Sequence, residues 1–256
     1  MPEGILEKQV SHWLEQQVPN FESPVDYQLI TGGHSNLTFK CEDATGRAVV
    51  LRRPPLGHVL ESAHDMSREY RIIHALRQTK VPVPEALGLC QDKTVNGADF
   101  YVMDFVEGVV LNDAVIGSTI PAQARPDLAH NVIHILCDLH DVDMDAVGLG
   151  TLGRKEAYLS RQLNRWNKQW QATKTHDIPE MEASSALLME RIPEQLGASI
   201  VHGDFRLGNM IVDQGRVEAI LDWELCTLGD PLADLGYLLN NWLGEDEGVG
   251  IDVADK

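Results

Sequence analysis

Cysteine is scarce in this chain of 256 residues, and its four cysteines lie far apart in the sequence. Zinc sites and redox-active dithiols typically place two cysteines two residues apart, and no such C-x-x-C pair occurs here. A disulfide framework is not indicated either, because the cysteines are few and dispersed. The composition therefore predicts reduced thiols at Cys41, Cys90, Cys137 and Cys226.

The chain also lacks a long uninterrupted run of apolar residues. No stretch approaches the ~18 apolar residues that would be needed to cross a bilayer. The N-terminal segment, MPEGILEKQVSHWLEQQV, mixes acidic with apolar residues, and it lacks the basic start and apolar centre of a signal peptide. These absences predict a cytoplasmic protein that does not span a membrane.

Basic residues are few relative to acidic ones. The sequence has 21 lysines and arginines against 39 aspartates and glutamates, which gives a formal net charge of −18. A surface this acidic repels nucleic-acid phosphates and anionic lipids, so we expect neither nucleic acid nor a membrane surface as a partner. The hydrophobic content of 43% is ordinary for a packed core, and the length suits one large domain or two lobes.

Several motifs of well-known enzyme classes are missing. The sequence has no G-x-S-x-G nucleophile elbow and no G-x-x-x-x-G-K-[ST] phosphate loop. Gly148, Gly150 and Gly153 do spell G-x-G-x-x-G, but a helix predicted to end at His140 precedes them, where a strand would be required. We interpret this glycine pattern as an ordinary loop.

The first part of the chain predicts strands with a few helices. Apolar residues at helical spacing predict helices over 4–18 and 67–78. Strands are expected at 27–30 and 37–41, on either side of the turn TGGHSN, and further strands at AVVLRRPP, VPVPEALGLC and DFYVMDFVEG. This order is typical of a small α+β lobe.

The character of the sequence changes after Gly108, where helical patterns dominate. Helices are expected over 125–140, 156–173 and 182–195, and another follows Pro231. Between the last two lie the segment HGDFRLGN, the strand MIVD, a turn at Gln214-Gly215 and the strand VEAILDW. We place the domain boundary near Glu107.

The segment HGDFRLGN, residues 202–209, groups side chains suited to metal and proton chemistry. An ionised Asp only accepts hydrogen bonds, and the amide oxygen of Asn is a good ligand for a hard metal. Asp222 follows Asn209 by thirteen residues, and the hairpin through Gly215 would fold it back toward Asn209. Asn209 and Asp222 therefore predict a Mg²⁺ site, with Asp204 left to accept a proton from a hydroxyl group. Asp and Asn also favour turns, so a purely structural role for either motif alone stays open.

HGDFRLGN followed by AILDWELCTLGDPLADL resembles the aminoglycoside phosphotransferase and choline kinase family, a branch of the protein-kinase-like fold. The segments SREYRIIHAL and YVMDFVEG and the helix end at His140 fit the same family. The resemblance implies a two-lobed α+β fold, with a small β-rich N-lobe over 1–106 and a larger helical C-lobe over 107–256. The resemblance also leads us to expect a C-lobe that is short at its C-terminus relative to the family. The segment GLGTLGRKEAYLSRQLNRWNKQW is similar to the branch fused to, or encoded beside, acyl-CoA dehydrogenases.

Carried over to this chain, the resemblance makes Asp204 the catalytic aspartate and Asn209 and Asp222 the magnesium ligands. It also places the nucleotide-binding residues. The glycine flap over the phosphates, the phosphate-binding cation with its partner, and the linker that contacts adenine correspond to Gly32, Gly33, Ser35, Arg52, Glu69, Asp104 and Val106.

Arg52 departs from the family, which has a lysine at this position. Arginine is always charged and binds phosphate or carboxylate through two donors, so the electrostatic role survives with a changed geometry. Glu69 is its expected partner, and the adjacent Arg53 competes for the same role.

The resemblance implies a phosphotransferase that uses ATP and Mg²⁺ to phosphorylate a hydroxyl group of a small molecule. A hydroxyacyl compound and an aminoglycoside-like alcohol are both open as acceptors, and a functional link to an acyl-CoA dehydrogenase is expected. A nucleotide-binding pseudokinase with weak catalysis is the alternative, because of Arg52. A protein kinase is not expected, because only seven residues separate Asp222 from Asp230 and leave no peptide-binding activation segment.

Overall fold

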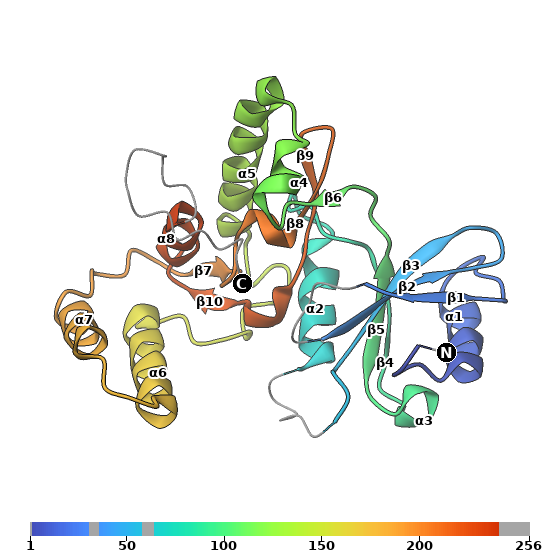
Figure 1. Cartoon of the computed structure of the whole chain (residues 1–256), viewed down its shortest axis with the longest axis horizontal. Coiled ribbons are helices and arrows are strands. Elements are labelled where there is room, and N and C mark those ends of the chain that lie inside the picture. Colours follow the sequence, from blue (N-terminus) through green and yellow to red (C-terminus); the bar gives the residue numbers. More distant parts are fainter. Residues whose placement is uncertain (1, 31–35, 58–63, 241–256) are drawn as a thin grey trace. The chain divides into compact units, whose positions relative to one another are not determined.

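The structure, a computed structural model, describes residues 2–30, 36–57 and 64–240 (Figure 1). The chain divides into two compact units, each of which combines segments distant in sequence. The first comprises Met1–Ile135 and Leu207–Glu224, and the second comprises Leu136–Arg206 and Leu225–Lys256. The domain boundary near Glu107 stays a prediction.

A five-stranded sheet is the centre of the first unit. The strands run in the order β1-β2-β3-β5-β4, and every neighbouring pair is antiparallel. The predicted hairpin around TGGHSN is confirmed by the pairing of its two strands. The bounds are β1 (Asp26–Leu29), β2 (Leu37–Glu42), β3 (Ala48–Arg53), β4 (Ala86–Cys90) and β5 (Phe100–Asp104).

Two helices, α1 (Glu7–Gln17) and α2 (Met66–Leu76), cover opposite faces of this sheet (Figure 1). Alternate residues of β3 point to opposite faces, so Val49 and Leu51 join the apolar core under α1, while Arg52 faces α2. Because both faces are covered, β3 is buried along nearly its whole length. Helix α2 begins where it does because the side chain of Asp65 accepts the amide of Arg68, which caps its N-terminus.

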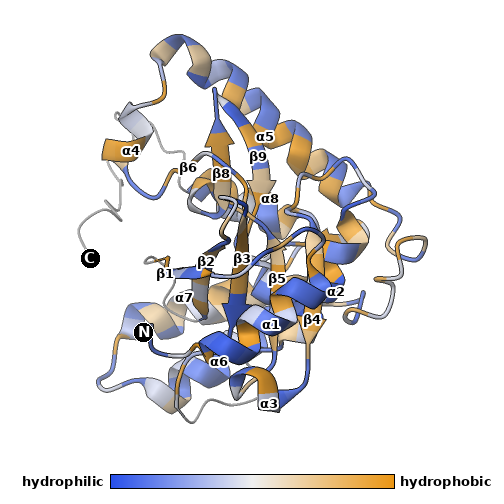
Figure 2. Cartoon of the chain, turned by 90° about the vertical axis from the view of Figure 1, so that its right-hand side faces the viewer, coloured by the Kyte–Doolittle hydropathy of each residue, from blue (hydrophilic) through white to orange (hydrophobic). Residues whose placement is uncertain are grey.

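The remaining elements of the first unit include a three-stranded sheet in the order β6-β8-β9, whose strands are β6 (Val109–Val110), β8 (Met210–Asp213) and β9 (Arg216–Ile220). The same unit also contains short helical segments: α3 (Lys93–Asn96), α4 (Ala114–Ser118), η2 (Ala122–Ala124), η3 (Leu207–Asn209) and the start of η4 (Trp223–Leu225). Helix α5 (Arg125–His140) contributes to both units and has the predicted bounds. Figure 2 shows α5 as alternating hydrophilic and hydrophobic bands, which matches its buried residues Leu128, Val132, Ile135, Leu136 and Leu139.

The second unit is mostly helical. Its elements are α6 (Tyr158–Thr173), α7 (Pro179–Glu190), α8 (Leu232–Asn240) and a two-stranded antiparallel sheet of β7 (Ser199–Val201) and β10 (Thr227–Gly229). The pattern of the sequence did not predict this sheet, because its strands are three residues long and are paired across 25 intervening residues.

Helix α7 corrects the predicted bounds of 182–195. It begins at Pro179, because proline suits the first helical position, where the missing N–H is not needed. It ends at Glu190, since Pro193 disfavours helical backbone in the residue before it.

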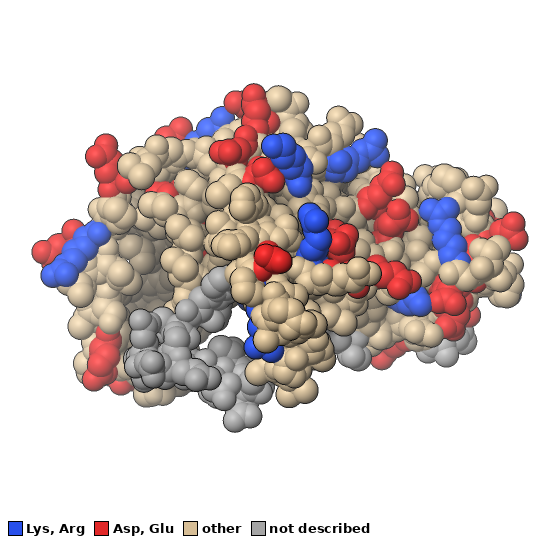
Figure 3. Space-filling view, turned by 90° about the horizontal axis from the view of Figure 1, so that it is seen from above, with Lys and Arg blue, Asp and Glu red and all other residues tan. Residues whose placement is uncertain are grey.

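None of the helices within the described residues is both long enough and apolar enough to cross a membrane. On the face drawn in Figure 3, acidic and basic side chains are interspersed rather than gathered into patches of one sign. The charge imbalance of the sequence is therefore spread over this surface.

Candidate active site

A buried cluster of charged side chains in the first unit has Arg52 at its centre. Nε of Arg52 lies 3.3 Å from Oε2 of Glu69, and Nη2 of Arg52 donates to Oδ1 of Asp222 at 2.5 Å. A guanidinium is a planar fork, so one side chain can contact two carboxylates at once. The ion pair between Arg52 and Glu69 that the sequence predicts is present, and its role in nucleotide binding stays a prediction.

Glu69 is almost completely buried and is held from three sides. The hydroxyl of Tyr101 donates to its Oε2 at 3.0 Å, and Nδ2 of Asn36 donates to its Oε1 at 3.1 Å, in addition to the ion pair with Arg52. Burial raises the pKa of Glu69 to about 7, because it outweighs the Arg52 guanidinium and the Tyr101 hydroxyl, which both lower it. Glu69 therefore titrates near neutral pH.

The pKa of Arg52 shifts upward as well. Burial alone would lower it, but Tyr101, Glu69 and Asp222 together raise it further than burial lowers it. The two shifts have different causes, since burial raises the pKa of Glu69, whereas the surrounding acidic groups raise that of Arg52. Arg52 accordingly stays charged, and the nearby acids compete for it.

Arg53 lies on the opposite face of the sheet from Arg52, as strand alternation requires. Its guanidinium donates to three main-chain carbonyls, those of Gly4, Pro54 and Asn96, and burial lowers its pKa. Arg53 therefore holds the N-terminal segment against the sheet. Of the two adjacent arginines, only Arg52 reaches the cluster.

Asn209 and Asp222 are distant in sequence, and the hairpin of β8 and β9 brings their main chains close together in space. Met210 pairs with Ile220, and the amide of Leu221 donates to the carbonyl of Asn209 at 2.8 Å. The predicted strand VEAILDW is shorter than expected, because β9 ends at Ile220 and Asp222 lies beyond it. Asp222 instead adopts a left-handed backbone with φ +65°, a conformation that Asp tolerates better than most residues and that ends regular pairing.

Asn209 and Asp222 are the two side chains predicted to bind Mg²⁺. Among the described residues, no group of three or more His, Cys, Asp or Glu side chains is placed to hold a metal ion. Mg²⁺ does not need such a group, because it is usually bound by one or two protein oxygens together with phosphates and water. One carboxamide and one carboxylate at neighbouring hairpin ends fit that requirement.

In the second unit, Asp234 of α8 holds the backbone of the loop that begins at His202. Its Oδ2 accepts the amide of His202 at 2.7 Å, and its Oδ1 accepts the amide of Gly203 at 2.8 Å. Nε2 of His140, at the end of α5, lies 3.2 Å from the same Oδ2. A buried carboxylate that accepts two amides satisfies donors whose burial would otherwise be costly. Asp234 therefore anchors this loop to α8.

Asp230, which lies just before α8, makes a different contact. Its Oδ1 accepts the amide of Leu232 at the start of α8, and its Oδ2 has no hydrogen-bond partner among the described residues.

Gly203 is required in the loop, since its φ of +86° is left-handed and an added Cβ would lie 3.0 Å from the carbonyl oxygen of Leu225.

Asp204 lies in this anchored loop and is partly exposed. Its amide donates to Nδ1 of His202 at 3.2 Å, so that histidine supports the loop by a hydrogen bond. Nε of Arg206 lies 3.2 and 3.3 Å from the two carboxylate oxygens of Asp204. The pKa of Tyr237 is raised by burial and then by its hydrogen bond to Asp204. The carboxylate is thus oriented by neighbours on α8 and in its own loop.

Asp104 is the last residue of β5, and Val106 lies in the linker that follows it. The amide of Asp104 donates to the carbonyl of Glu85 at 2.9 Å, and its carboxylate lies 3.7 Å from Nη2 of Arg47. Burial raises the pKa of Asp104 more than Arg47 lowers it. Val106 is half-buried beside it. Contact of this linker with adenine stays a prediction.

Three predicted phosphate-binding residues, Gly32, Gly33 and Ser35, lie outside the described residues. Two residues of the first-unit cluster were not predicted from the sequence. Asn36 is the last residue of the TGGHSN motif, and Tyr101 lies in the predicted strand DFYVMDFVEG. Each therefore belongs to a segment that the sequence had already singled out.

The loop containing G-x-G-x-x-G follows helix α5 and not a strand, as expected from the sequence. The side chain of Asp143 accepts the amides of Asp145 and Ala146, and Leu149 is buried. The loop is therefore folded around its own side chains, and its interpretation as an ordinary loop is confirmed.

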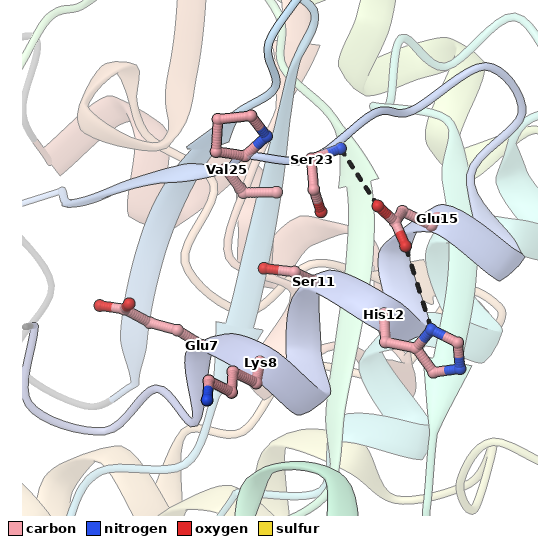
Figure 4. Close-up of a pocket in the computed structure, with 8 residues that line it drawn as sticks. Glu7, Lys8, Ser11, His12, Glu15, Ser23 and Val25 are labelled. Atoms are coloured by element: carbon pink, nitrogen blue, oxygen red, sulfur yellow. Dashed lines mark hydrogen bonds and ion pairs between the residues drawn. The ribbon is translucent and has the colours of Figure 1, made fainter.

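A hollow of about 360 Å³ lies against α1 (Figure 4). Polar side chains contribute to its lining: Glu15 accepts the amide of Ser23 at 3.2 Å, and His12 lies beside Glu15. Because α1 covers the sheet face opposite Arg52 and Glu69, this hollow is separate from the charged cluster.

A family model described as "Phosphotransferase enzyme family" matches residues 26–254. Among curated proteins, acyl-CoA dehydrogenase family member 10 of Mus musculus is 38% identical over 239 residues, which cover 93% of this chain and 22% of the mouse protein. Member 11 of Gallus gallus is 37% identical over 238 residues, covering 92% of this chain and 30% of the chicken protein. This chain therefore spans less than a third of the length of these relatives.

Among solved structures, the chain resembles a Ralstonia eutropha protein named as a candidate aminoglycoside phosphotransferase. The identity is 36%, the TM-score is 0.79, and the match covers 96% of this chain and 74% of that one. The streptomycin–ATP–APH(2″)-IIa ternary complex shares the fold at 17% identity, with a TM-score of 0.62 and coverage of 89% and 73%. These likenesses confirm the predicted α+β, protein-kinase-like fold.

Proposed function

This chain belongs to the phosphotransferase enzyme family, and from that premise we propose that it transfers the γ-phosphate of ATP to a hydroxyl group of a small molecule with Mg²⁺. The observation that carries this proposal is the buried Arg52 shared between Glu69 and Asp222. Phosphoryl transfer depends mainly on positioning and on positive charge beside the triphosphate. A fixed guanidinium next to a metal-type carboxylate supplies the protein's part of that charge.

Each of the proposed residues has a distinct role. Asn209 and Asp222 would hold Mg²⁺, which neutralises the phosphate oxygens. Arg52 would donate its fork to phosphate oxygens, and Glu69 would keep Arg52 in place. The backbone of Asp104 and Val106 would contact the adenine, and Gly32, Gly33 and Ser35 would cover the phosphates.

Asp204 would accept a hydrogen bond from the acceptor hydroxyl and take its proton. The acceptor oxygen then bonds to the γ-phosphorus, the bond from that phosphorus to the β–γ bridging oxygen breaks, and ADP leaves. The contact of Asp204 with Arg206 supports this role, because it orients a carboxylate that is still partly exposed.

The names of the relatives support two acceptor classes. The curated relatives at 37% to 38% identity are named acyl-CoA dehydrogenase family members, which favours a hydroxyacyl compound and a functional link to an acyl-CoA dehydrogenase. An aminoglycoside is the competing acceptor, supported by the solved streptomycin complex and by the charge of −18, which attracts polycations.

One observation favours the second candidate function, a nucleotide-binding pseudokinase. Arg52 stands where the family has lysine, and it contacts Asp222 directly, so it competes with a metal for that carboxylate. Such a protein would bind nucleotide and transfer phosphate weakly or not at all.

Replacing Asp204 tests the proposal. We expect Asp204→Asn to lower the rate of Mg²⁺-dependent ADP release by about 10²- to 10⁴-fold, the range for loss of a general base, while nucleotide affinity is kept. Asp213→Asn is the matched control, because Asp213 is exposed at the end of β8. Equal rates in wild type and Asp204→Asn would remove Asp204 from the mechanism, and nucleotide binding without any transfer would favour the pseudokinase.

The acceptor is identified by measuring ADP release with a panel of hydroxylated metabolites that includes hydroxyacyl-CoA thioesters and aminoglycosides. Turnover of a hydroxyacyl thioester above that of every aminoglycoside is expected. The reverse order would overturn the preferred acceptor class and leave the phosphotransferase proposal standing.

A further inference from the structure

Asn36 connects three parts of the first unit through one buried side chain. It lies directly before β2 and is 4% exposed. Its Oδ1 accepts from Nδ1 of His64 at 2.8 Å, and its Nδ2 donates to Oε1 of Glu69 at 3.1 Å. A longer contact of 3.4 Å joins the same Nδ2 to Oε2 of Glu224, two positions after Asp222. Both donors of the amide thus face carboxylates.

The chemistry of an amide suits this position. Glu69 and Glu224 repel each other, and Glu224 is among the groups that raise the pKa of Glu69. An amide NH₂ offers two donors without a charge, so it can hold two carboxylates without competing with Arg52 for either. The amide is oriented by its partners, because ionised carboxylates only accept and His64 supplies the donor to its oxygen.

We propose that Asn36 is a positioning residue for the proposed phosphoryl transfer. It fixes Glu69, which in turn holds Arg52 where the nucleotide phosphates would bind, and it fixes Glu224 in the segment that follows Asp222. This inference rests on the proposed function and adds a residue that the resemblance did not assign. Asn36 itself touches neither nucleotide nor acceptor in this role.

The test compares Asn36→Ala with Asn96→Ala. Asn96 is a matched control, because it is also a buried asparagine of the first unit, but its Oδ1 accepts the amide of Leu6 far from the cluster. Calorimetric titration with ATP and Mg²⁺ is expected to show about tenfold weaker binding for Asn36→Ala, the loss of roughly one charge-assisted hydrogen bond. Asn96→Ala is expected to bind as wild type does, although its unfolding temperature falls.

A double-mutant cycle separates positioning from general packing. If Asn36 acts through Glu69 and Arg52, then adding Asn36→Ala to Arg52→Met changes ATP affinity by less than about twofold, because the residue it positions is already gone. An undiminished effect in that background would show that Asn36 acts independently of Arg52, and it would overturn the inference.

The remaining outcomes are also decisive. Equal ATP affinity in Asn36→Ala and wild type would overturn the inference and leave the proposed function standing. A wild-type protein that binds no nucleotide would overturn both. If Asn36→Ala does not fold, Asn36→Ser serves instead, since its hydroxyl is too short to reach either carboxylate and the same results are expected.

Discussion

Arg52 and Arg53 are adjacent in sequence and chemically identical, yet they have opposite environments. Arg52 meets carboxylates on the α2 face, whereas Arg53 meets only carbonyls on the α1 face. Because side chains alternate along a strand, the two guanidinium groups lie on opposite faces of the sheet. Both are buried, so each must find its partners on its own face. At the scale of the residue, the cluster around Arg52 therefore depends on which residues of β3 face α2.

The raised pKa of Glu69 predicts a pH dependence of stability. A carboxyl group whose pKa rises from 4.5 to about 7 on folding stabilises the protein fully below pH 4.5, and this contribution is lost as the pH rises through 7. Between about pH 5 and pH 8, wild type should lose on the order of 2 to 3 kcal/mol relative to Glu69→Gln, which does not titrate.

The measurement is urea unfolding of both proteins across that pH range. The comparison uses the slopes, because the substitution also removes an ion pair and shifts the whole curve by a constant. Parallel pH profiles would mean that Glu69 keeps its ordinary pKa in the folded protein.

At the scale of the element, the β8–β9 hairpin brings Asn209 and Asp222 to neighbouring positions. Its two turn residues, Gln214 and Gly215, have φ of +46° and +78°. Two consecutive left-handed residues make the tight turn whose twist matches that of antiparallel strands. The turn sets the pairing of Asp213 with Arg216, and the pairing shifts by one residue between Ile211 and Val212. The resulting register places both predicted ligands at the same end of the hairpin.

Gly215→Ala should destabilise the protein by about 1 to 2 kcal/mol, because alanine resists left-handed backbone. The added Cβ would also lie 3.2 Å from Cβ of Ala124. Gly117→Ala is the matched control, since Gly117 lies in α4 with open space around it, and it should gain up to about 1 kcal/mol. Chemical denaturation of the two variants checks the opposite signs, and a shift in the same direction would contradict this account of the turn.

At the scale of the whole molecule, the formal net charge of −18 opposes compactness through self-repulsion. Raising NaCl from about 10 mM to about 150 mM shortens the Debye length from about 30 Å to about 8 Å, so the unfolding temperature should rise. Thermal unfolding at fixed pH checks this, with choline chloride as the control for specific ion binding. An unfolding temperature that stays constant or falls in both salts would show that the surface charges are not mutually destabilising.

The division into two units is also a property of the whole molecule, because each unit combines segments that are distant in sequence. The loop anchored by Asp234 and the hairpin carrying Asn209 follow one another in the chain but are counted in different units. Apolar periodicity and turn residues within a short stretch of sequence cannot predict which distant segments form one unit.

The sequence by itself determined most of the elements and the identity of the main side chains of the candidate site. The hairpins, helices α2, α5 and α6, and the motifs around Asp204, Asn209 and Asp222 follow from periodicity, turn residues and capping, which act over a few residues. The pairing of Arg52 with Glu69 was also within reach, through the resemblance to the family.

Only the tertiary structure decided which of two arginines enters the cluster, that β7 pairs with β10, and that Asn36 and Tyr101 complete the surroundings of Glu69. It also decided that Asp222 leaves the strand in a left-handed turn. These features depend on contacts between residues far apart in the chain, whose free energy arises from burial and pairing in the folded core. Local propensity carries no record of those contacts, because they do not exist until the chain has folded.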